Sequence, residues 1–335
     1  MNRCFNVQIN PYLEFMNAIL LTSRYNEITK PYVGYGLMTE EDNEYTNALK
    51  AFLKPYHNEP IYEIVEKMIP KGFTFSRPVE LMLSLGNSTD FEIQLTISPL
   101  CIEYCGGIDQ IKTLLKEMKA FEKKVDFFNF FNSIKTFYNL IIEKVSETVL
   151  AYPFIKLIEE QFGTQQNSYN YVISSLMIGN FGINFVDNKT NKLDIFSVFA
   201  IDDYSLSPSV LFHEYSHPFI NPLTGKYYDL VQKYKYAYEK LKNYKLPNYK
   251  SGYGDFKEYV NEHFVRAMTI HLIKKINQRE MASELLENDL YRGYIFIPEI
   301  LKKYEYYDLN RDTFLNFDQF YPELINVFSQ DIKIG

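Results

Sequence analysis

The chain has 335 residues, with 35 basic and 42 acidic side chains and a formal net charge of −7. This length allows one large domain or two modest ones with a sizeable core, and 46% hydrophobic residues is usual for a globular protein. The negative charge excludes a general electrostatic attraction to nucleic acid or to an anionic membrane. No stretch approaches the roughly 18 to 20 apolar residues of a membrane-spanning helix. We therefore expect neither a nucleic-acid partner nor a membrane span.

The three cysteines, Cys4, Cys101 and Cys105, are too few for a disulfide framework and lack zinc-finger spacing. We interpret them as ordinary free thiols, and free thiols are typical of proteins in a reducing compartment. Residues 12–22 are partly apolar, but Glu14 interrupts them and no small-residue cleavage site follows, so no secretory signal is visible. We expect a cytoplasmic protein by default, and a secreted or periplasmic one if a leader has been removed.

Residues 1–150 predict a helical N-terminal region of unknown role. The segment 11–20 begins with a proline suited to a first helical turn and continues with apolar residues at helical spacing. The segment 76–85 opens in a similar way, and 109–149 is again helical in pattern. No residue of this region belongs to a chemical motif that we can name.

The character of the sequence changes after Gly163, where three short runs rich in β-branched and aromatic residues predict strands. They cover 169–177, 183–186 and 194–201, and the polar loop between the last two is typical of a hairpin. We therefore expect a small antiparallel sheet. Two long helical patterns follow further along the chain, at 226–243 and 255–275. The predicted fold class is α+β and predominantly helical.

The motif that carries chemistry lies between the strands and these helices. Ser207 is a favoured N-cap and Pro208 suits the first helical position, so a helix is predicted to begin there. His213 and His217 then lie one turn apart on one face, where both imidazoles can reach one metal ion. Glu214 follows the first histidine and can accept a proton from a water that the metal activates. This arrangement predicts a catalytic zinc site.

Two alternatives to zinc are a chance match and a pair of core histidines. With five histidines in 335 residues, chance yields this pattern in well under about 1% of such chains. Core histidines leave Glu214 unexplained, because a carboxylate beside the apolar segment 210–212 costs several kcal/mol unless it is paired or linked to a metal. Pro218 directly follows His217, so the helix is predicted to kink or end there.

A third protein ligand is needed, because a catalytic zinc keeps three protein ligands and one open position. The segment 260–273 is apolar nearly all round, as a buried helix is, so its polar side chains need partners. We choose Glu262 as the third ligand. The simpler reading of Glu262 is an ion pair with Arg266 one turn later. His263 and Glu258 are the competing ligands.

The motif from His213 to His217, together with Glu262 on a later helix, resembles the gluzincins, the thermolysin-like and aminopeptidase-like zinc metallopeptidases. Its context is similar to an uncharacterised bacterial family of predicted gluzincins, and the resemblance covers roughly residues 165–275. It implies that Zn²⁺ is held by His213, His217 and Glu262. It also implies that Glu214 is the general base and that the substrate is a peptide or protein.

The resemblance further implies a zincin-like core, in which the antiparallel sheet precedes the metal-binding helix, and a catalytic region over residues 151–335. One departure is that Arg266 stands where members often carry a carboxylate that supports a metal-binding histidine. That support is then expected from elsewhere, with Asp202 or Asp203 as candidates. The alternative is that these two aspartates are turn residues after a strand.

The developing oxyanion needs a donor, and Tyr253 is our candidate catalytic residue for this role, because its glycine-rich loop can place the phenol over the metal. The alternative is a packed surface tyrosine. The other candidate donors are His263, Arg266 and His271. Two different functions stay open. A zinc-containing binding protein without catalysis would need no base such as Glu214, and a zinc hydrolase can act on a substrate other than a peptide.

Overall fold

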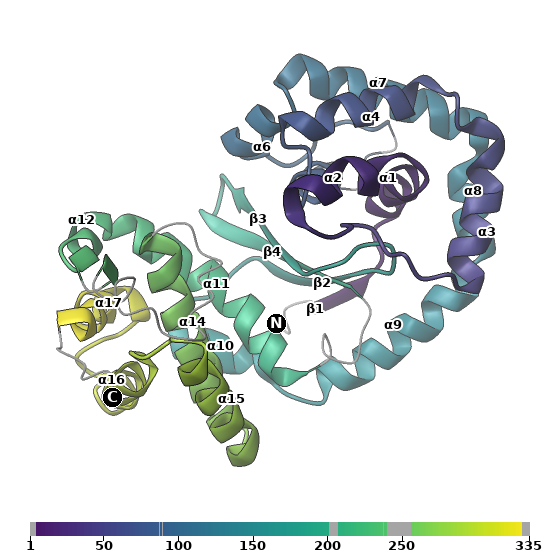
Figure 1. Ribbon diagram of the computed structural model, residues 1–335. Coiled ribbons are helices and arrows are strands. Elements are labelled where there is room, and N and C mark those ends of the chain that lie inside the picture. Colours follow the sequence, from purple (N-terminus) through teal and green to yellow (C-terminus); the bar gives the residue numbers. More distant parts are fainter. Residues whose placement is uncertain are drawn as a thin grey trace. The chain divides into compact units, whose positions relative to one another are not determined.

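The computed structural model describes most of the chain, in the ranges 5–86, 88, 90–200, 207–236, 238–239 and 256–329. Four residues discussed above lie outside these ranges, namely Cys4, Asp202, Asp203 and Tyr253. The fold is mixed, predominantly helical with one small sheet, as the sequence predicts (Figure 1). No helix in the described ranges has the length and hydrophobicity that crossing a bilayer requires.

The chain forms two compact units, and each consists of two segments. The first unit contains Met1–Glu147 and Asn167–Ser205, and the second contains Thr148–Gln166 and Leu206–Gly335. The chain first passes from one unit to the other between Glu147 and Thr148, close to the domain boundary expected at residue 150. The strands that we expected in the second region belong instead to the first unit.

The first unit contains a four-stranded sheet in the order β1-β2-β4-β3. Its strands are β1 (Phe5–Gln8), β2 (Ser168–Ser174), β3 (Phe181–Asp187) and β4 (Lys192–Ala200). The β1–β2 and β2–β4 pairs are parallel, and only the β3–β4 hairpin is antiparallel. The prediction of an antiparallel sheet was therefore wrong. The N-terminal strand pairs with β2, and β3 lies outside β4 instead of between β2 and β4.

Burial along the strands follows from this order. The central strand β2 is buried at nearly every position and is paired with a neighbouring strand on each side. The edge strand β3 alternates between buried and exposed positions. Val172 and Val198, on the neighbouring strands β2 and β4, share one hydrophobic core with Phe15 and Met16 of the first helix.

The helices of the first unit surround that first helix, α1 (Pro11–Thr22) (Figure 1). Asn10 caps α1 by accepting hydrogen bonds from the backbone N–H groups of Tyr12 and Leu13. The other α-helices that begin in this unit are α2 (Tyr25–Val33), α3 (Glu44–Leu53), α4 (Pro60–Met68), α5 (Ser76–Leu83), α6 (Pro99–Tyr104), α7 (Ile108–Val125), α8 (Phe127–Ser133) and α9 (Lys135–Leu150). The predicted helical stretch 109–149 is thus three helices, and the first break falls at Asp126, whose φ is 56°.

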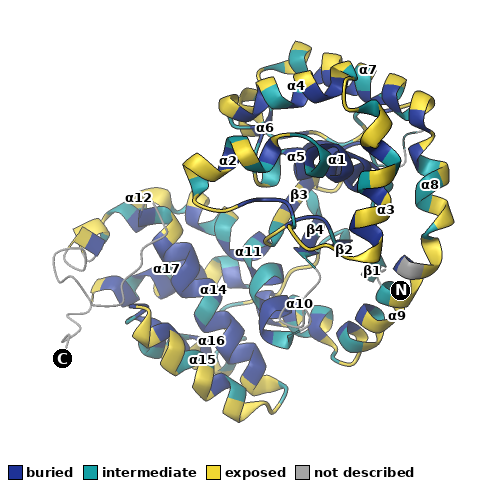
Figure 2. Cartoon of the chain, turned by 45° about the vertical axis from the view of Figure 1, so that its right-hand side comes forward, coloured by how far each residue is buried: buried dark blue, intermediate teal, exposed yellow. Residues whose placement is uncertain are grey.

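The second unit is helical in its described part. Its helices are α10 (Phe154–Phe162), α11 (Pro208–Lys226), α12 (Tyr228–Gln232), α14 (Phe256–Lys275), α15 (Arg279–Tyr291), α16 (Ile297–Leu309) and α17 (Phe317–Ile325). Helix α14 is buried almost all round and packs on α11, α15 and α16, as Figure 2 shows by its dark colour. The prediction of a helix at 255–275 is confirmed.

Helix α11 begins as predicted. Ser207 accepts a hydrogen bond from the N–H of Ser209, and Pro208 occupies the first helical position. The helix does not end at Pro218 but continues through it and through Pro222 to Lys226. A proline inside a helix removes one backbone hydrogen bond and crowds the carbonyl group four residues earlier. Helix α11 nevertheless continues through both prolines and packs on α14.

Candidate metal centre

Helices α11 and α14 lie side by side (Figure 1) and together supply three potential metal ligands. The Nε2 atoms of His213 and His217 are 3.2 Å apart. The Nε2 of His217 lies 3.4 Å from Oε1 of Glu262, and the Nε2 of His213 lies 3.9 Å from Oε2 of Glu262. This group can hold a metal ion, because one donor atom from each residue lies within 4.8 Å of the other two.

The three donors lie at the border between interior and solvent. The side chain of Glu262 is 8% exposed, whereas those of His213 and His217 are 21% and 22% exposed. Burial lowers the pKa of His213 well below its ordinary value, and the charges of His217 and Arg266 act in the same direction. His213 is therefore held neutral, and the neutral imidazole is the form that binds a metal.

Glu214 lies next to His213 on α11 and is partly buried. Burial raises the pKa of its carboxyl group. The charge of His217 opposes this rise, and the charge of Glu262 adds to it. The pKa of Glu214 therefore depends on the charges of two of the potential metal ligands. A carboxyl group in such surroundings can accept and release a proton.

The ring of His217 is oriented by Asn221, one turn later on α11. The Nδ1 of His217 lies 3.3 Å from Oδ1 of Asn221. With Nδ1–H donating to this oxygen, Nε2 keeps its lone pair for a metal. Sequence reasoning missed Asn221, although its spacing of four residues from His217 was a usable signal.

Glu262 belongs to the group of potential metal ligands and also forms an ion pair with Arg266. The two interpretations of this glutamate are therefore compatible. The Nε of Arg266 donates to Oε2 of Glu262 at 3.0 Å. The Nη1 of Arg266 donates to Oδ1 of Asp289 on α15 at 2.8 Å. Burial raises the pKa of Asp289, against the opposing charge of Arg266. Asp289 carries no motif in the sequence that would have identified it.

The competing third ligands do not join the group. The ring of His263 is fully buried, and its Nδ1 lies 2.9 Å from the carbonyl oxygen of Tyr259 on the same helix. Burial lowers the pKa of His263 to about 3. Neither His263 nor Glu258 belongs to the cluster of possible ligands that the described residues contain.

Two of the candidate oxyanion donors are engaged in other contacts. Arg266 is engaged with Glu262, and His271 pairs with Asp308 through a 2.9 Å contact. Tyr253 lies outside the described residues, so its predicted role stays a prediction.

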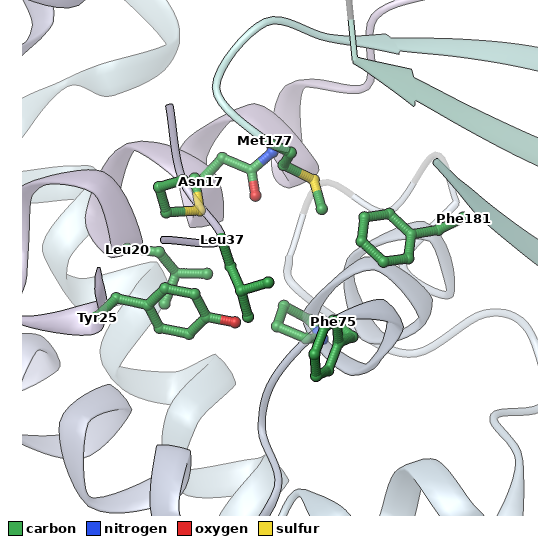
Figure 3. A pocket seen from close by; sticks show the side chains of 9 residues that line it. Asn17, Leu20, Tyr25, Leu37, Phe75, Met177 and Phe181 are labelled. Carbon is green, nitrogen blue, oxygen red and sulfur yellow. The ribbon is translucent and has the colours of Figure 1, made fainter. Parts of the chain in front are cut away.

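The first unit contains a different feature, a small hollow shown in Figure 3. The room inside it, about 10 Å³, is about what one water molecule needs, far less than most small-molecule sites offer. Its walls are mainly apolar, with Phe75, Met177 and Phe181 among them, and Asn17 and Tyr25 are the polar members. It has no pair of acidic or basic side chains, so it is a weaker candidate for catalysis than the group on α11 and α14.

Comparison with known proteins yields one match. The model of a family described as a domain of unknown function (DUF4932) matches residues 5–327. The chain belongs to this family. No curated protein and no solved structure matches the chain. Because the DUF4932 family model spans nearly the whole chain, it includes both units and all three potential ligands. Membership gives no activity, so the function has to follow from the chemistry of the site.

Proposed function

We propose that this member of the DUF4932 family is a zinc-dependent hydrolase, specifically a metallopeptidase. The observation that carries the proposal is the convergence of His213, His217 and Glu262 from two helices. Glu262 lies 45 residues after His217 in the sequence, yet its carboxylate and the two imidazoles each offer a donor atom within 4.8 Å of the other two. The glutamate that follows the first histidine completes the set of groups that hydrolysis by a metal-activated water requires.

The separations of the donor atoms support one shared ion. Two donors that each lie about 2.05 Å from a tetrahedral zinc are about 3.3 Å apart. The two histidine nitrogens are 3.2 Å apart, and the nitrogen of His217 is 3.4 Å from Oε1 of Glu262. The nitrogen of His213 is farther from the carboxylate, 3.9 Å from Oε2. Two of the three separations therefore match those around one tetrahedral ion, and the third would have to shorten.

The donor set favours zinc in a catalytic role. Two neutral imidazoles and one carboxylate are the ligands of several hydrolytic zinc sites. In the described part of the chain, no fourth histidine, cysteine or carboxylate joins the group. A binding protein with a structural zinc would be expected to close that position with a fourth side chain. Glu214 beside the first ligand favours an enzyme over a zinc-stabilised binding protein, because a structural zinc needs no base.

A zinc ion bound there would lower the pKa of a water molecule and polarise a carbonyl group. Glu214 would accept the proton of that water on its carboxylate and pass it to the leaving amine. Asn221 would hold the ring of His217 in the tautomer that leaves Nε2 available.

A peptide substrate and a zincin-like core over residues 151–335 are the parts of the proposal that depend most on the resemblance to gluzincins. The sheet differs from the one that the resemblance implies, because two of its strand pairs are parallel and its strands belong to the first unit. The peptidase assignment therefore rests on the motif and on the three potential ligands. The motif itself specifies an activated water and does not specify its target. A zinc hydrolase acting on another substrate is therefore the second outcome that the test must distinguish.

The test is cleavage of a mixed peptide library by the zinc-loaded protein, followed by mass spectrometry. We expect cleavage by the wild type, none after chelation, and recovery when zinc is restored. Glu214→Gln is the matched control, because it keeps the size and the metal ligands and removes the base. We expect this variant to retain zinc and to lose activity by at least about 100-fold. Zinc binding without cleavage of any peptide would leave the metal site standing and refute the peptidase.

A further inference from the structure

Arg266 stands one turn after Glu262 on α14, and three contacts hold its side chain. Its Nε donates to Oε2 of Glu262 at 3.0 Å, and its Nη1 donates to Oδ1 of Asp289 at 2.8 Å. The guanidinium carbon lies 4.4 Å from the centre of the Tyr294 ring. The side chain is only 14% exposed. Arg266 is therefore fixed in place by groups from α14, from α15 and from the segment that follows α15.

Stability is a weak explanation for this arrangement. Removing two carboxylates and a guanidinium from water costs several kcal/mol for each ion, and replacing such a buried cluster by apolar side chains is often neutral or stabilising. Asp289 is also 8% exposed at its side chain, although it takes no part in the proposed chemistry. The cluster thus places two further charged residues behind one metal ligand. A role in positioning that ligand explains why they are there.

The contact of Arg266 makes the two oxygens of Glu262 different. A carboxylate can bind a metal through one oxygen or through both. The guanidinium donates to Oε2, which lies 3.9 Å from Nε2 of His213, whereas Oε1 lies closer to the histidines, 3.4 Å from Nε2 of His217. Arginine suits this task, because its planar group directs N–H bonds at fixed angles and always carries its charge.

We propose that Arg266, held by Asp289, is a positioning residue that reserves Oε2 of Glu262 and leaves Oε1 as the only oxygen for the metal. This inference rests on the proposed zinc site. It gives Glu262 one bond to the ion, so that two histidines and one oxygen leave a coordination position open. It also assigns a function to the arginine that stands where the resemblance to gluzincins would place a carboxylate.

The test compares zinc affinity, measured by competition with a chromogenic chelator, for the wild type and for Arg266→Met and Arg266→Lys. Arg311→Met is the matched control. Arg311 also lies 4.4 Å from a tyrosine ring, that of Tyr307, but it donates to the backbone carbonyls of Glu160 and Gln161. We expect Arg266→Met to weaken zinc binding by about 10- to 100-fold, as losses of groups that orient metal ligands do. We expect a smaller loss for Arg266→Lys and no change for Arg311→Met.

A second readout reports the coordination itself. With Co²⁺ in place of zinc, the intensity of the visible absorption bands falls when the ion passes from four to five ligands. We expect strong bands for the wild type and for Arg311→Met. We expect weaker bands per bound ion for Arg266→Met, because Oε2 is then free to enter. Far-ultraviolet circular dichroism checks that each variant is folded.

The outcomes separate this inference from the proposed function. A wild type that binds no metal overturns both. A wild type that binds zinc, together with an Arg266→Met variant of the same affinity within about threefold and an unchanged cobalt spectrum, overturns the inference alone. Equal losses in Arg266→Met and Arg311→Met also overturn it, because they indicate general destabilisation.

Discussion

A cluster of polar side chains around Asp308 joins three helices of the second unit. Its contribution to the stability of the fold can be estimated from the pKa of Asp308. The Oδ2 of Asp308 on α16 accepts from His271 at 2.9 Å and from Lys275 at 2.7 Å, both on α14. Its Oδ1 accepts from Gln161 on α10 at 3.1 Å. Burial alone would raise the pKa of Asp308, but these hydrogen bonds and charges outweigh it and lower the pKa from 3.8 to about 2.

The lowered pKa of Asp308 determines how its contribution to stability changes with pH. A carboxyl whose pKa is lower in the folded than in the unfolded protein stabilises the fold above its unfolded pKa. The contribution is lost as the pH falls from about 4 toward 2. At about 1.36 kcal/mol for each pH unit, the difference corresponds to about 2 kcal/mol at neutral pH. The side chain is 26% exposed, so solvent screening reduces this figure only in part.

The variant Asp308→Asn keeps the size of the side chain and removes its charge. We expect it to lower the thermal midpoint of the second unit by about 4 to 8 °C at pH 7, followed by circular dichroism. The matched control is Asp318→Asn, which breaks the more exposed pair with Lys226 and should cost less than about 1 kcal/mol. The difference in thermal midpoint between the wild type and Asp308→Asn should become smaller as the pH falls below 4. An equal difference at pH 3 and at pH 7 would refute the reasoning.

Two further predictions concern the helices that carry the ligands. Asn221→Ala removes the hydrogen-bond acceptor at Nδ1 of His217. We expect zinc affinity, measured by chelator competition, to fall about tenfold. An unchanged affinity would mean that Asn221 does not orient the ring. Thr224→Val removes a buried hydroxyl that hydrogen bonds Asn261 of α14 and Tyr321 of α17. We expect a loss of about 1 to 3 kcal/mol in urea unfolding, and a loss below about 0.5 kcal/mol would contradict this.

The candidate site could be predicted largely because its signals are local. The spacing of His213 and His217 places both on one face of any helix, and Ser207 with Pro208 marks where that helix begins. Glu262 was recognised by a physical conflict, a carboxylate within an apolar helix. That reasoning finds a residue in need of a partner even when the partner lies far away in the sequence.

The remaining features depend on contacts that no local pattern encodes. Strand β1 pairs with β2 at Phe5 and Tyr169, and nothing in either segment specifies that parallel register. Pro218 predicts a kink or an end to its helix, but α11 continues past it while packed on α14. Asp289 lies in a helix of mixed composition, and only the packing of α15 on α14 brings it to Arg266.

The central claim, that one zinc ion is held by His213, His217 and Glu262, is tested most directly by metal content. The measurement is elemental mass spectrometry on protein purified without chelator, for the wild type, Glu262→Ala and Glu258→Ala. Glu258 is the matched control, because it lies one turn earlier on the same helix and outside the ligand group. We predict about one zinc per chain in the wild type and in Glu258→Ala, and a sharp reduction in Glu262→Ala. A wild type without zinc even after reconstitution, or full zinc content in Glu262→Ala, would contradict the account.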